Sequence, residues 1–259
     1  FPFRQHEGVF QILFTVRNLK MNYAAGWPLF DNANGQVMFL NDSVEINITQ
    51  AMARKARLEA TKISIPSFQN SDYLLAQGKV VTTVPAGLDF LQHTPLKLPL
   101  KAIAEQIRLT GTTQVDLDLK IPLSEAVQAK VQGTAHLDNA QLQVLAIDLP
   151  ISGVTGDLKF TESRFYSDPL QGFALQQPIT ATITQNVSQT EIIAEGTIET
   201  GALQRHFSIP NQTIATGTTN YQLALTLPFN EQPAHLQINS SLQGLWLNLP
   251  DNLAKTAQE

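Results

Sequence analysis

Residues with the chemistry for catalysis or metal binding are few and scattered in this 259-residue chain. Asp116 and Asp118 stand two apart, which would place a pair of carboxylates on one face of a strand, but Lys120 follows on the same face and favours a solvated, charge-balanced surface. None of the five histidines has the HExxH or HxH spacing of a metal site: His6, His93, His136, His206 and His235. The sequence also lacks a GxSxG nucleophile elbow, a GxGxxG loop and a P-loop. It therefore predicts no enzyme, no cofactor and no metal ion.

The composition excludes further classes of protein. The chain has 17 Lys and Arg against 22 Asp and Glu, a net charge of −5, and no cysteine. An acidic, weakly charged surface is a poor match for a polyanion, so no nucleic-acid partner is expected. Without cysteine there is no disulfide scaffold or thiolate metal site. Charged residues make up only 15% of the chain, and much of the polarity is carried by 25 Gln and 24 Thr. With 43% hydrophobic residues, this composition is typical of an ordered domain.

Strict alternation of apolar and polar residues dominates the chain. In residues 114–121, 128–138, 179–184 and 221–229, every second side chain is apolar and most of those between are polar. Period-2 patterns indicate strands with one dry and one wet face, and they favour antiparallel sheet. The aliphatic positions predicted to line the dry faces are Val115, Leu117, Leu119, Ile121, Val131, Ala135, Leu137, Ile179, Ile183, Leu223, Leu225 and Leu227.

Less regular strands are predicted between these segments, separated by Gly, Asn, Asp and Pro. They cover residues 8–16, 35–40, 44–49, 54–65, 74–83, 141–147, 156–160, 191–200 and 244–249. The Asp31–Gly35 run and Asn139 are interpreted as turns. Helical spacing is confined to a proline-broken stretch around residues 86–107. Trp27 and Trp246, next to turn-like proline segments, are expected to pack as anchors. The predicted fold is all-β and mainly antiparallel, with one short helical insertion.

Parts of the pattern recur at a spacing of about 106 residues. GTTQVDLDLKIPL from Gly111 is similar to GTTNYQLALTLPF from Gly217, and the segments that follow match after a slip to a spacing of 105. Recurrence of this kind is typical of stacked repeats. We expect one segment of a larger protein over residues 1–259, with repeat units of approximately 8–110, 111–216 and a truncated 217–259.

Several short sequence segments, in the same order along the chain, resemble those of the YhdP-type proteins of the bacterial AsmA-like superfamily. They are YAAGWPLFDNANGQVMF from Tyr23, ISIPSF from Ile63, LDFLQHTPL from Leu88, LTGTTQVDLDLKIPL from Leu109 and GVTGDLKF from Gly153. The resemblance implies a long curved sheet of repeats that forms an open apolar groove and conducts phospholipid between the inner and outer membranes of Gram-negative bacteria. It also implies a periplasmic location, with membrane contact through parts that this chain lacks. The family supplies no catalytic residue that can be transferred.

Three functions remain open at this stage. In the first, the dry faces form a groove that holds phospholipid acyl chains, lined by the twelve aliphatic residues named above, and the other partners are neighbouring repeats of the full-length protein. In the second, the chain is a closed β-sandwich or solenoid that pairs with neighbouring domains through its strand edges. The third, an enzyme on a β scaffold, has no supporting constellation of residues.

Overall fold

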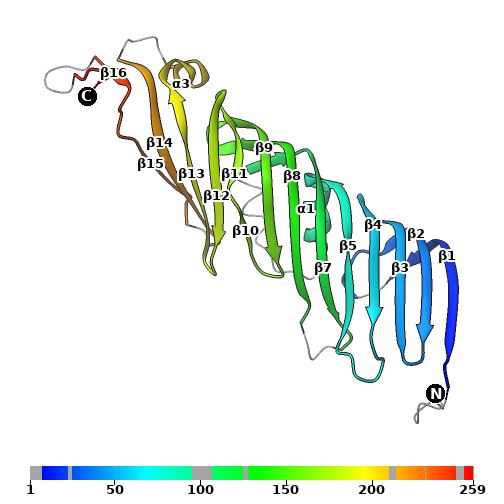
Figure 1. The fold of residues 1–259 in the computed structure, drawn as a ribbon. Coiled ribbons are helices and arrows are strands. Elements are labelled where there is room, and N and C mark those ends of the chain that lie inside the picture. The colour runs from blue at the N-terminus through cyan, green and yellow to red at the C-terminus, as the bar shows by residue number, and fades with distance from the viewer. Residues whose placement is uncertain are drawn as a thin grey trace. The chain divides into compact units, whose positions relative to one another are not determined.

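The computed structural model describes residues 8–22, 25–94, 107–124, 128–209, 214–230, 232–248 and 254–258. Its strands form one open antiparallel sheet, in the order β1-β2-β3-β4-β5-β7-β8-β9-β11-β12-β13-β14-β15, with β6 paired to β8, β10 to β9 and β16 to β14 (Figure 1). This confirms the all-β, mainly antiparallel prediction. The chain divides into two compact units: unit 1 contains residues 1–100, 111–136 and 159–164, and unit 2 contains the remainder.

The strands of the first half of the chain are β1 (Gln11–Met21), β2 (Phe30–Leu40), β3 (Ser43–Ala53), β4 (Ala56–Ile65), β5 (Tyr73–Thr83), β6 (Ile107–Thr110), β7 (Thr112–Pro122) and β8 (Lys130–Val144). Those of the second half are β9 (Leu149–Thr161), β10 (Phe165–Ser167), β11 (Leu170–Ala174), β12 (Gln177–Gln185), β13 (Gln189–Glu199), β14 (Ala215–Pro228), β15 (His235–Asn239) and β16 (Leu245–Leu247). The helices are α1 (Val84–Gln92) and α3 (Thr200–His206), and η1 (Leu145–Ile147) is a single 3-10 turn.

The pairing register in unit 1 places like residues on the same face. One row across five strands is apolar, because Val37, Ile46, Ile63, Ala76 and Leu119 pair in that order. The adjacent row, on the opposite face, is polar: Gln36, Asn47, Lys62, Gln77 and Asp118. Successive strand residues point to opposite faces. The predicted division into a dry and a wet face therefore holds here.

Unit 2 repeats the arrangement with other residues. Ala181, Ala194, Leu223 and Ile238 pair across β12, β13, β14 and β15 in an apolar row. The adjacent polar row consists of Thr180, Glu195, Gln222 and Asn239. The aliphatic positions predicted in 179–184 and 221–229 therefore share one face.

Two segments interpreted as turns lie inside strands instead. Asn32 is in β2 with φ 53°, and Asn139 is in β8 with φ 55°. Asn tolerates this left-handed conformation, which a bulge in a strand needs as much as a turn does. Consequently β2 begins at Phe30, and the two strands predicted at 128–138 and 141–147 are one strand, β8, followed by η1.

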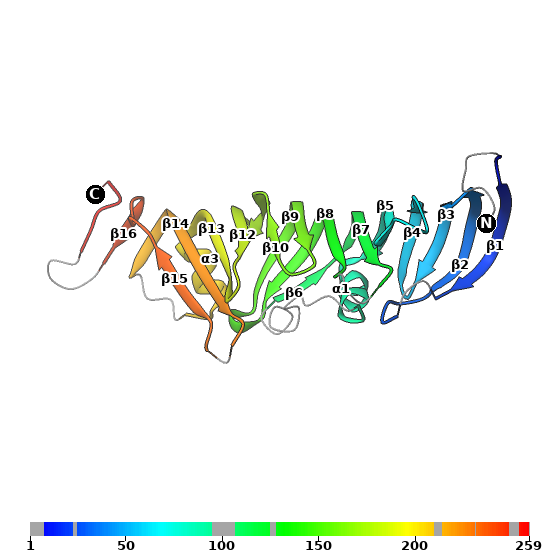
Figure 2. The same ribbon diagram turned by 90° about the horizontal axis from the view of Figure 1, so that it is seen from below.

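The helical prediction is correct in one place and incomplete in another. Helix α1 begins after Thr83, whose Oγ1 accepts a hydrogen bond from the Ala86 amide at 3.3 Å, and it contacts β4 and β5 (Figure 2). Residues 95–106, the rest of the predicted insertion, lie outside the described residues. Helix α3 was not predicted, because seven residues without a side-chain cap are too few to show a helical period.

The two similar segments have matching local geometry. Gly111 and Gly217 have φ of 119° and 123°, a region that favours glycine. Leu109 pairs with Leu142 in the first segment, and Ala215 pairs with Leu247 in the second. Ala215 follows Leu109 by 106 residues and Leu247 follows Leu142 by 105, the same two spacings as in the sequence. A short helix precedes each segment, α1 before the first and α3 before the second. The boundaries of the repeat units stay a prediction.

Candidate functional site

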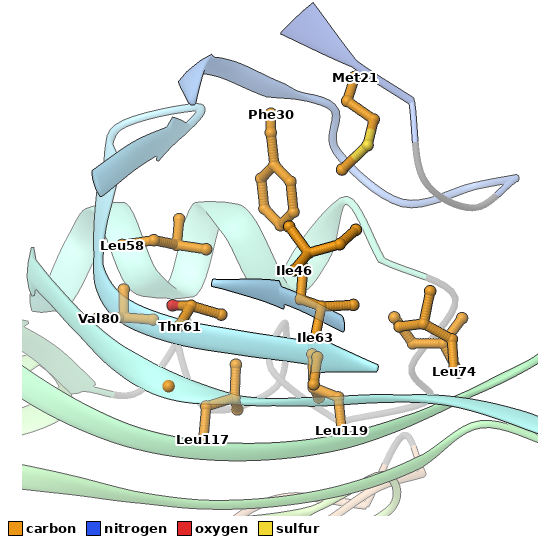
Figure 3. A pocket seen from close by; sticks show the side chains of 13 residues that line it. Met21, Phe30, Ile46, Leu58, Thr61, Ile63, Leu74, Val80, Leu117 and Leu119 are labelled. Carbon is orange, nitrogen blue, oxygen red and sulfur yellow. The ribbon is translucent and has the colours of Figure 1, made fainter. Parts of the chain in front are cut away.

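The apolar face of unit 1 contains a pocket of about 180 Å³, which we call the unit 1 pocket (Figure 3). Six strands contribute to it: β1, β2, β3, β4, β5 and β7. Its lining is Met21, Phe30, Ile46, Leu58, Thr61, Ile63, Leu74, Ala76, Gly78, Val80, Leu117, Leu119 and Ile121. Figure 3 shows Phe30, Ile46 and Ile63 pointing toward one another from three neighbouring strands. Twelve of these residues present no side-chain polar group, so the pocket suits hydrocarbon.

Thr61 carries the pocket's one side-chain polar group, and it is already satisfied. The residue is 6% exposed, and its Oγ1 donates a 3.2 Å hydrogen bond to the backbone oxygen of Glu59. Gly78, on the neighbouring strand, leaves room for it, because a Cβ there would lie 2.9 Å from Thr61 Cα. The threonine therefore presents its methyl group and no free hydroxyl to a ligand.

The structure brings only part of the predicted lining together. Leu117, Leu119 and Ile121 line the unit 1 pocket, and Val115 extends their face of β7, paired with Val80. Val131 and Ala135 are in the unit 1 part of β8, outside the residues that line the pocket. Leu137 is on the same strand and belongs to unit 2.

The other five predicted residues lie on the apolar face of unit 2. Ile179 is in a small core with Ala174 and Ala194, against which Leu223 packs. Ile183 and Leu225 both pair with Ile192, and Leu227 pairs with Thr190. Burial raises the pKa of Tyr221, whose phenol packs against this core. This face is a second apolar surface of the same kind.

Sequence reasoning missed most of the pocket lining. Ile46 and Ile63 each lie between two polar residues, so the signal was present there, but Leu75 interrupts the alternation around Leu74 and Ala76. It was weakened by a bulge at Ala60, with φ 43°, where the register between β4 and β5 shifts. Met21 and Phe30 lie at strand ends and carry no periodic signal.

The polar face of unit 1 carries several ion pairs. Lys62 Nζ lies 2.7 Å from Glu45, and together with Asn47 it holds the pKa of that carboxyl below its ordinary value. Asp116 lies 3.1 Å from His136 Nε2 and 3.9 Å from Lys79 Nζ. The solvated surface predicted around Asp116 is therefore confirmed. In the described part of the chain, no three His, Cys, Asp or Glu side chains are grouped as a metal site would require.

The two tryptophans differ in how far they are buried. Trp27 is buried, at 8% exposure, as predicted for an anchor. Trp246 is 40% exposed in the short strand β16, so the same prediction was wrong there.

Comparison with known proteins identifies the family to which these apolar faces belong. The family model described as "YhdP protein" matches residues 1–259. The chain belongs to the YhdP family. This YhdP-family chain is 25% identical over 268 aligned residues to the "Intermembrane phospholipid transporter YhdP" of Escherichia coli (strain K12). The alignment covers all of the chain and 21% of that relative, so the chain spans about a fifth of its length. No solved structure matches the chain.

Within the described residues, no helix is long and apolar enough to cross a membrane. The described strands also form one sheet, so the second layer that a closed sandwich needs is not among them. The apolar faces, rather than a polar cluster, are the candidate functional site.

Proposed function

We propose that the apolar face of this chain holds the acyl chains of phospholipid, as one segment of a non-enzymatic conduit between the inner and outer membranes. The observation that carries the proposal is the unit 1 pocket, an aliphatic hollow on the face of an open sheet. The name of the E. coli relative, an intermembrane phospholipid transporter, supports the same ligand and a location in the periplasm.

The dimensions of unit 1 suit an acyl chain. Five adjacent strands from β2 to β7, at about 4.8 Å spacing, extend for about 19 Å. One leaflet of a bilayer has a hydrocarbon depth of about 15 Å, half of the ~30 Å core. A cavity of about 150 Å³ accepts benzene, so 180 Å³ holds a stretch of about six carbons. The rest of the chain would lie along the open face, with the headgroup in water at its edge.

The energetics favour retention with movement along the face. Each CH₂ group kept from water contributes about 0.8 kcal/mol, so a two-tailed lipid would seldom leave sideways into solvent. Displacement along an aliphatic wall exchanges one apolar contact for another, and the barrier between successive positions should therefore be low. Neighbouring repeats of the full-length protein would extend the wall by pairing with the edge strands β1 and β15.

The test is lipid loading of the purified chain and of two matched variants. Leu117→Asp places a carboxylate in the pocket, and Gln114→Asp places the same charge on the exposed polar face of β7. We expect native mass spectrometry to find phospholipid on the unmodified chain and on Gln114→Asp, and much less on Leu117→Asp. A chain that neither carries lipid nor takes up fluorescent phospholipid would refute the proposal. Equal loading of the two variants would show that the pocket is not the site.

A further inference from the structure

The polar face of unit 2 carries a shallow depression of about 660 Å³, lined mainly by uncharged polar residues. We call it the polar depression. Its lining is Pro178, Thr180, Glu195, Gly196, Thr197, Asn220, Tyr221, Gln222, Asn239, Ser240 and Ser241. The core of the depression is the polar row Thr180, Glu195, Gln222 and Asn239, which crosses four strands in register. Hydroxyl, amide and carboxylate groups thus stand side by side on a rigid sheet, where a binding site is held most accurately.

Three polar side chains of this depression are available to a ligand, whereas Thr197, Asn239, Ser240 and Ser241 are engaged in local hydrogen bonds. Glu195, Asn220 and Gln222 are exposed, and within the described part of the chain their side chains make no hydrogen bond to one another or to other residues. The corresponding face of unit 1 differs, because Gln77 donates to Asp118 at 2.8 Å and Lys62 pairs with Glu45. Glu195 and Gln222, which pair across β13 and β14, therefore keep their side-chain donors and acceptors free, unlike these two pairs of unit 1.

The charge of the region defines the class of ligand. Arg205 is the only Lys or Arg between residues 165 and 254, and Glu195 is the only charged residue that lines the depression. A phosphate or other anion would find no cation to pair with there, so lipid headgroups and nucleic acids do not fit. A neutral ligand with many hydroxyl and amide groups does fit, because amides both donate and accept and the carboxylate accepts.

An exposed aromatic ring borders the depression. Phe173 in β11 is 51% exposed and pairs with Pro178, which lines the depression. Its neighbours in sequence, Gly172 and Ala174, belong to the apolar face, so Phe173 projects from the polar face. The ring lies over Gly153, where a Cβ would be 3.4 Å from Phe173 Cδ2. A flat apolar ring beside hydrogen-bonding side chains suits a sugar, which has an apolar face and a rim of hydroxyls.

We propose that the polar depression binds a neutral, N-acetylated glycan. Glu195 would accept from a hydroxyl or an acetamido N–H, the Asn220 and Gln222 amides would bond the acetamido carbonyl, and Phe173 would stack on a sugar ring. Glu195, Gln222 and Phe173 project from the face opposite the apolar residues of unit 2, so their part in glycan binding does not depend on the proposed lipid function.

The experiment titrates the 259-residue chain with chitohexaose, the β-1,4 hexamer of N-acetylglucosamine, and with cellohexaose, which has the same linkage without acetamido groups. We expect saturable binding of chitohexaose with a Kd below about 1 mM by calorimetry, and at least about five-fold weaker binding of cellohexaose. Glu195→Gln should weaken chitohexaose binding about ten-fold, and Phe173→Ala about five-fold. Lipid loading of both variants should be unchanged.

Glu191→Gln is the matched control, because Glu191 lies on the same face of β13, four residues from Glu195, and outside the depression. It should bind chitohexaose like the unmodified chain. Failure of chitohexaose to saturate at about 10 mM, equal affinity for cellohexaose, or an equal effect of Glu191→Gln would each overturn the glycan site. A lipid-free chain that still binds chitohexaose would refute the lipid proposal alone.

Discussion

Filling the unit 1 pocket without adding charge should remove acyl chains from this part of the sheet. Ala76 lies in the middle of the pocket, where it pairs with Ile63 on one side and Leu119 on the other, and it is 8% exposed. A phenylalanine at this position would project its ring into the cavity. Since a cavity of about 150 Å³ holds benzene, the ring would occupy most of the 180 Å³.

The magnitude follows from the hydrocarbon that the ring would displace. About six CH₂ groups at about 0.8 kcal/mol each amount to about 5 kcal/mol of lost burial for the lipid. That corresponds to a local occupancy lower by about three to four orders of magnitude. The protein should lose little stability, because burying a Phe side chain contributes about 1.5–3 kcal/mol and overpacking costs about 1–3 kcal/mol. A shift in Tm of no more than about 4 °C is expected.

The assay is photo-crosslinking with a phospholipid that carries a diazirine on one acyl chain, followed by mapping of the labelled peptides. In the unmodified chain, label should appear on peptides from β4, β5 and β7, which supply most of the lining. Ala76→Phe should reduce that label at least about ten-fold, a conservative fraction of the calculated effect. Label on the unit 2 peptides should persist.

Leu75→Phe is the control, because it adds a ring at the next residue of β5, whose side chain points to the opposite face. Its labelling should match that of the unmodified chain. Undiminished labelling of β4, β5 and β7 in a folded Ala76→Phe variant would refute the reasoning, since the lipid would then not occupy the pocket.

Three further predictions concern stability and association. Thr190 is 1% exposed, and its Oγ1 has no hydrogen-bond partner in the described structure. Thr190→Val should therefore raise the free energy of unfolding by about 1 kcal/mol and the Tm in thermal denaturation by about 2–4 °C. An unchanged or lower Tm would contradict this. Arg54 holds the pKa of Asp89 below its ordinary 3.8. The stability that this ion pair gives α1 is therefore fully present above pH 3.8 and is lost as the pH falls through the lowered pKa. Amide hydrogen exchange of α1 should show this acid dependence, and Asp89→Asn should abolish it. Ile238 is 59% exposed on the edge strand β15, so Ile238→Lys should reduce concentration-dependent self-association in analytical ultracentrifugation. Equal self-association of the variant and the unmodified chain would show that this edge does not pair.

The face of each regular strand could be predicted from sequence because a period of two is a direct consequence of backbone geometry. Residues 114–121 show this best, since Leu117, Leu119 and Ile121 all line the pocket. Strand boundaries were predicted less well where Asn is left-handed. Asn32 and Asn139 have the residue type of a turn but lie inside β2 and β8, Asn32 where the register with β3 shifts, and local sequence does not separate a turn from a left-handed residue within a strand.

The pocket itself depends on information that no single strand contains. Its lining comes from six strands, and which residues meet is set by pairing registers and by the shift at Ala60. The polar depression is similar, because Thr180, Glu195 and Gln222 are adjacent only through register. Alternation predicts which face a side chain occupies, and register determines its neighbours.

The separation of the two faces also makes the two proposed functions independent. In a single-layer sheet, a side chain reaches one face only, so Leu117→Asp and Ala76→Phe act on the apolar face and Glu195→Gln on the polar one. Backbone hydrogen bonds that hold each strand are common to both faces and change in none of these variants. Loss of lipid with glycan binding retained, or the reverse, would therefore report on one face, whereas loss of both would indicate unfolding of the sheet.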